Sequence, residues 1–124
     1  MASLLDGAGQ IKIAVLDEAV SQTQRLHGIV ERYAMALKNQ QETGSYRQQL
    51  MRAGAPLAGI LKPQFSVTAD SVNSFLQIAG RGGSDQVKVR ALREAVASIR
   101  AQLEIAASKV KEKHSVGGAT VGKE

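Results

Sequence analysis

The sequence predicts an all-α protein, an elongated helical bundle with two long terminal helices and two shorter or kinked central helices. Two long stretches repeat apolar residues at steps of three and four, the spacing of a helix that packs against another helix. The 124-residue chain has two tyrosines, two phenylalanines and no tryptophan, and a core of aliphatic side chains and alanine lets helices approach closely. Its length suits one domain, predicted over residues 1–114, with a flexible tail over residues 115–124.

The last helix is predicted from Asp85 to Lys113 and would be about 43 Å long at ~1.5 Å per residue. Gly80 is placed to end the preceding helix, and Ser84 or Asp85 to cap the new one. The apolar stripe of this helix is unbroken, so we expect it to form an interaction seam with another helix or chain. The residues of this interaction seam are Val89, Leu92, Val96, Ile99, Leu103, Ala106 and Val110.

The first helix is predicted to begin between Ala8 and Ile11 and to run to about Gln41. It has the same three-four rhythm. Its stripe consists of Ile13, Leu16, Val20, Thr23, His27, Val30, Ala34 and Leu37. Alternation of apolar residues over residues 11–15 also allows a short strand, but the longer helical period is favoured.

Two shorter helices are predicted between the long ones. Ser45 and Gln48 fit a capping box that starts the second helix, and Pro56 between two glycines predicts a kink near Ala55 or a break into two short pieces. Thr68 is the expected N-cap of the third helix, which would end at Gly80.

The helix lengths leave two arrangements open. The four helices could alternate in direction as a bundle whose outer pair overhangs the inner pair, or residues 45–80 could form one kinked rod between two parallel long helices. We favour the four-helix arrangement. In both, the long helices carry more seam than the short ones cover, which predicts a second chain. Residues 10–20 also resemble residues 86–96, through either duplication or chance.

Composition excludes several kinds of chemistry. The chain has no cysteine, which excludes disulfides, thiolate metal sites and a cysteine nucleophile. The sequence starts without the features of a secretory signal, and no stretch approaches the roughly 18 apolar residues of a membrane span, so we expect a cytoplasmic protein. The net charge is +5, a mild excess that could attract nucleic acid, acidic proteins or anionic lipid, or none of these.

Thr23 and His27 interrupt the apolar stripe of the first helix. The pair could contact a ligand or metal or act as a pH-sensitive packing element, or it could fix the register of helices or the number of partners. We favour the register-setting role, because the other histidine, His114, lies in a helix end expected to fray and no metal-ligand spacing is present. We therefore predict no cofactor and no metal.

Four arginines are candidates for contact with an anion or a nucleic-acid backbone: Arg81, Arg90, Arg93 and Arg100. Glycines near Arg81 would let backbone amides converge just before a helix start. However, Glu94 and Glu104 lie four residues after Arg90 and Arg100, where they are expected to pair with them.

The sequence contains no motif of a known catalytic site. We expect a non-enzymatic helical assembly or adaptor protein that acts through self-association, as a homo-oligomer, or through helix packing on a protein partner. The alternative is a basic nucleic-acid-binding protein that makes phosphate contacts without sequence preference.

Overall fold

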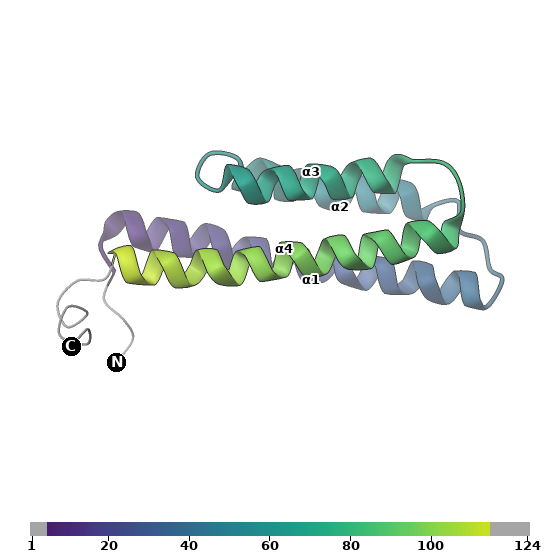
Figure 1. The fold of residues 1–124 in the computed structure, drawn as a ribbon, viewed down its shortest axis with the longest axis horizontal. Helices are drawn as coiled ribbons and strands as arrows, with labels where there is room; N and C mark the ends of the chain where they lie inside the picture. Colours follow the sequence, from purple (N-terminus) through teal and green to yellow (C-terminus); the bar gives the residue numbers. More distant parts are fainter. Residues whose placement is uncertain (1–4, 115–124) are drawn as a thin grey trace.

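The computed structural model describes residues 5–114, and this part of the chain folds into four helices. The element order is α1 (Gly7–Lys38), α2 (Tyr46–Leu61), α3 (Ser66–Gly80) and α4 (Asp85–His114). The predicted all-α bundle of two long terminal helices and two shorter central ones is confirmed (Figure 1). Residues 11–15 are part of α1, so the alternative of a short strand there is wrong.

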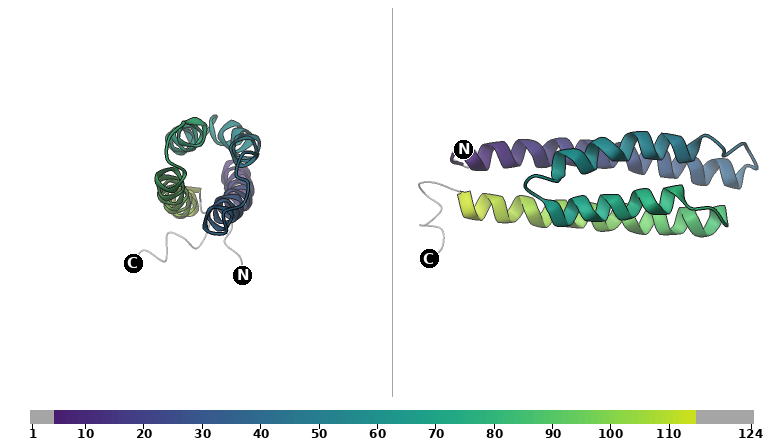
Figure 2. Two further views of the ribbon diagram at one scale, coloured as in Figure 1. Left: turned by 90° about the vertical axis from the view of Figure 1, so that its right-hand side faces the viewer. Right: turned by 90° about the horizontal axis from the view of Figure 1, so that it is seen from above.

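The helices alternate in direction around a common axis (Figure 2). Each packs against its neighbours in the chain, and α1 also packs against α4, which closes the ring. The chain reverses between α2 and α3, so the two form separate helices and not a single central rod. Figure 1 shows that α1 and α4 extend beyond α2 and α3 at the end where the described chain starts and finishes.

The interaction seam of α4 lies inside the bundle. Val89, Leu92, Val96, Ile99, Leu103 and Val110 are all buried, and Ala106 is half-buried. Helices of the same chain cover this stripe, because α4 packs on both α1 and α3. These residues are therefore the core of the bundle, and they leave no open stripe that a second chain would have to cover.

The buried face of α1 is wider than its predicted stripe. Leu26 and Tyr33 are buried, whereas their predicted counterparts His27 and Ala34 are only half-buried and Val20 is exposed. The buried face is wider because α1 contacts α4 on one side and α2 on the other, and its apolar residues must face both neighbours.

The two central helices differ from the predictions at their starts and middle. Thr68 lies buried inside α3, which begins two residues earlier with Phe65 at the N-cap position, so the predicted cap is wrong. Ser45 does precede α2 but its side chain caps no backbone amide; it accepts a hydrogen bond from Gln49 Nε2 at 3.0 Å. Helix α2 also continues through Pro56 as one helix, so the predicted alternative of two short pieces is wrong.

Gly54 allows α2 and α3 to approach closely. A Cβ atom at this position would lie 2.6 Å from Leu76 Cδ2 of α3, closer than carbon atoms can pack. The glycine that suggested a helix break in the sequence therefore serves helix packing.

No helix within residues 5–114 is both long and apolar enough to cross a membrane.

Candidate functional site

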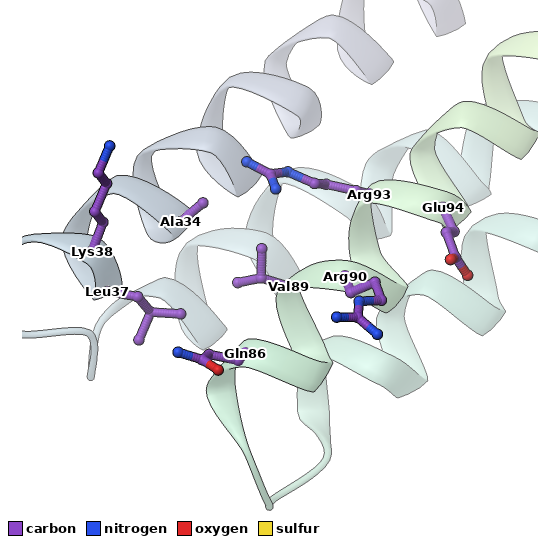
Figure 3. A pocket seen from close by; sticks show the side chains of 8 residues that line it. All are labelled: Ala34, Leu37, Lys38, Gln86, Val89, Arg90, Arg93 and Glu94. Carbon is purple, nitrogen blue, oxygen red and sulfur yellow. The ribbon is translucent and has the colours of Figure 1, made fainter.

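A hollow of about 510 Å³ opens between the end of α1 and the start of α4. We call it the α1–α4 groove. Figure 3 shows its lining, which consists of Ala34, Leu37, Lys38, Gln86, Val89, Arg90, Arg93 and Glu94.

The floor of the groove is apolar. The side chains of Leu37 and Val89 point toward each other from the two helices (Figure 3). Val89 belongs to the buried seam, while Leu37 and the small Ala34 are half-buried. The groove therefore gives a solvent-accessible entry to the edge of the core.

Tyr33 fixes the register of α1 on α4 close to this groove. Its hydroxyl donates a hydrogen bond to Asp85 Oδ1 at the first residue of α4, and its ring stacks on Tyr46 of α2 with the centroids 5.2 Å apart. Burial, and after it the Asp85 carboxylate, holds the pKa of the Tyr33 hydroxyl above its usual range. Three helices are thus tied together where the groove begins.

An ion pair spans α1 and α4 beside the groove. Arg93 donates two hydrogen bonds to the carboxylate of Glu31, at 2.7 and 2.8 Å. Hydrogen bonding and charge attraction raise the pKa of Arg93 and lower the pKa of Glu31. The positive charge of Arg93 is therefore largely matched within the chain.

The four candidate arginines do not form one contact surface. Arg90 and Arg93 line the groove, whereas Arg81 lines a separate hollow of about 90 Å³ at the α3–α4 connection. Arg100 is exposed further along α4. The expected pairs of Arg90 with Glu94 and of Arg100 with Glu104 are not formed: among residues 5–114, the one ion pair that does not depend on a histidine proton joins Arg93 to Glu31.

Thr23 and His27 do not form a joint site. Thr23 is fully buried, and its hydroxyl donates to the carbonyl of Ala19 one turn earlier, at 2.7 Å. This bond satisfies the hydroxyl inside α1 without a ligand. His27 is half-buried on α1, and no group of three metal-ligating side chains gathers anywhere in the described part of the chain.

A cluster that the sequence did not reveal joins the two ends of the described chain. His114 Nδ1 lies 3.1 Å from Asp6 Oδ1, and its Nε2 lies 3.2 Å from Lys12 Nζ. A neutral imidazole with its proton on Nδ1 satisfies both contacts. The end of α4 is therefore anchored at His114, where fraying was expected.

The backbone reinforces this cluster. The Asp6 amide donates to the His114 carbonyl at 3.0 Å, and Asp6 Oδ1 accepts from the amide of Gly9 at 2.7 Å as the N-cap of α1. That amide, followed by His114 and Lys12, lowers the pKa of Asp6. A Cβ atom at Gly9 would lie 2.5 Å from the His114 Cβ, so glycine is needed for the approach.

Comparison of the chain with family models, with curated proteins and with solved structures finds no match.

Proposed function

We propose that this chain is a non-enzymatic helical assembly or adaptor protein that uses the α1–α4 groove to pack against a helix of another protein molecule. The bundle has already buried its own seam, so the contact must use a surface feature. The proposal also places the protein in the cytoplasm, where a chain without cysteine needs no oxidising environment.

The apolar floor of the groove is the observation that carries this proposal. Leu37 and Val89 face each other across a hollow of about 510 Å³ that opens to solvent. Grooves between two antiparallel helices accept a third helix by inserting one or two of its apolar side chains between theirs. The Arg93–Glu31 ion pair and the Tyr33–Asp85 hydrogen bond hold α1 and α4 in place beside the hollow, so little ordering cost remains for binding.

Site-specific photo-crosslinking tests the proposal. A photoreactive amino acid at Gln86, which is exposed at the edge of the groove, is expected to trap a protein in cells that produce the chain. The same amino acid at Gln48, an exposed position of α2, is the matched control and is expected to trap none. A second copy trapped at Gln86 would identify self-association, and a different protein would identify an adaptor role. No adduct, or the same adducts from both positions, would contradict the proposal.

Nucleic-acid binding is the second candidate, and it rests on two cations. Lys38 and Arg90 line the groove, and within residues 5–114 neither has a carboxylate within ion-pair distance. Phosphate contacts by these two side chains would weaken steeply with salt. This candidate predicts that the photoreactive group at Gln86 traps nucleic acid in place of protein.

A further inference from the structure

We propose that the α1–α4 groove receives an acidic amphipathic helix of a different protein. This inference rests on the proposed function and names the chemistry of the partner. Its apolar side would insert between Leu37 and Val89, and its carboxylates would meet Lys38 and Arg90.

The size of the groove matches about two turns of a helix. Its lining runs from Gln86 to Glu94 on α4, a length of about 12 Å at ~1.5 Å per residue. Two turns present two or three apolar residues on one face. The lining is apolar at Ala34, Leu37 and Val89, so one large aliphatic side chain of the partner would lose most of its contact with water there.

The rim of the groove carries unmatched positive charge. Arg93 is matched by Glu31, which leaves Lys38 and Arg90 as cations free to meet an acidic ligand. The one acidic lining residue, Glu94, points away from Leu37 and Val89 in Figure 3. Arg90 on α4 would therefore attract carboxylates that flank the apolar stripe of a partner helix. Lys38 on α1 points away from Leu37 and Val89 in Figure 3, and its long side chain would add its attraction by turning toward the groove.

The charge and the lining of the groove argue against two other occupants, a second copy of the chain and nucleic acid. A second copy of the chain also has a net charge of +5, so two copies repel each other as they approach. Nucleic acid would match the two cations but would gain nothing from the apolar floor, and no aromatic side chain lines the groove for base stacking.

The test uses two labelled synthetic helices and the full chain. Each helix spans about three heptads with leucine at the a and d positions; one has glutamate at the e and g positions and the other has lysine. Binding is measured by fluorescence anisotropy at low and moderate salt, with a labelled DNA duplex as the third probe. The groove variants are Lys38→Gln with Arg90→Gln, and Leu37→Glu. The control is Arg52→Gln with Lys62→Gln, which removes the same charge from an exposed position of α2 and from the exposed residue that follows its last turn.

The glutamate helix is expected to bind the natural chain more tightly than the lysine helix does. Loss of both rim cations should weaken this binding about tenfold, Leu37→Glu should abolish it, and the control should leave it unchanged. Equal binding of the two helices, equal weakening by the control, or displacement of the glutamate helix by DNA would overturn the inference. If the crosslink at Gln86 still traps a protein in that case, the proposed function stands and only the acidic partner is wrong.

Discussion

Replacing Gly54 with alanine is expected to destabilise the bundle, whereas the same change at Gly59 is expected to stabilise it. Both residues lie in α2, and in both cases alanine gains about 1 kcal/mol of helix propensity over glycine. Nothing lies within 4 Å of a Cβ at Gly59, so that position keeps the gain. The two substitutions thus separate helix propensity from helix packing.

The cost at Gly54 follows from its neighbours on two helices. A new Cβ would lie 2.6 Å from Leu76 Cδ2 and 3.8 Å from Leu26 Cδ2. Leu76 must move, and overpacking of this kind costs about 1–3 kcal/mol. After the propensity gain, we expect a net loss of about 1 kcal/mol, which lowers Tm by roughly 4 °C in a domain of this size.

Urea unfolding followed by circular dichroism measures both effects. In a chain with Leu76→Ala the obstacle is gone, so Gly54→Ala should there become stabilising, and the cycle should give a coupling of about 2 kcal/mol. A Gly54→Ala chain as stable as the Gly59→Ala chain, or an additive cycle with Leu76→Ala, would refute the close approach of α2 and α3.

Three further contacts give measurable expectations. A double-mutant cycle of Arg93→Ala with Glu31→Ala should give a small favourable coupling, because both side chains are roughly half exposed and water screens the pair. Since the pKa of Glu31 is lowered, this stabilisation is present above about pH 4.5 and disappears as pH falls through the lowered value. A coupling unchanged at pH 2 would contradict it. Tyr33→Phe should cost about 1–2 kcal/mol in urea unfolding, because Asp85 loses its donor. The natural chain should also lose stability as pH rises above 10, since the pKa of Tyr33 is raised, and the Phe variant should lose less; equal losses would count against this. His114→Ala should speed hydrogen exchange at the amides of Asp6 and Gly9 while leaving α3 unchanged, and unaltered exchange at both amides would show that the cluster anchors nothing.

The sequence predicted the features that depend on local spacing. The seam of α4 is readable because its residues recur every three or four positions, and all of them are buried or half-buried in the bundle. The start of α3 was not readable from Thr68, because a cap preference of about 1 kcal/mol competes with burial of Thr68 against neighbouring helices.

The candidate site depends on register between distant segments, which local spacing does not contain. Glu31 and Arg93 are 62 positions apart, and Asp6 and His114 are 108 apart. Glu94 follows Arg90 at the helical spacing of four residues, at which the two are expected to pair. The ion pair of α4 instead joins Arg93 to Glu31 of α1. The N-cap role of Asp6 was the one local clue to the cluster at the end of the bundle, since aspartate before a helix start is a preferred cap.

Because the amide of Asp6 donates a hydrogen bond to the carbonyl of His114, the first and last helices begin and end beside each other. A short linker could join these two residues, and the turn between α2 and α3 could then be opened to supply new termini. Such a circular permutant would keep every helix beside its present neighbours. The bundle could equally be inserted into a surface loop of a host protein. The end of α1 and the start of α4, which line the α1–α4 groove, would then lie at the opposite end of the bundle from the insertion point (Figure 1).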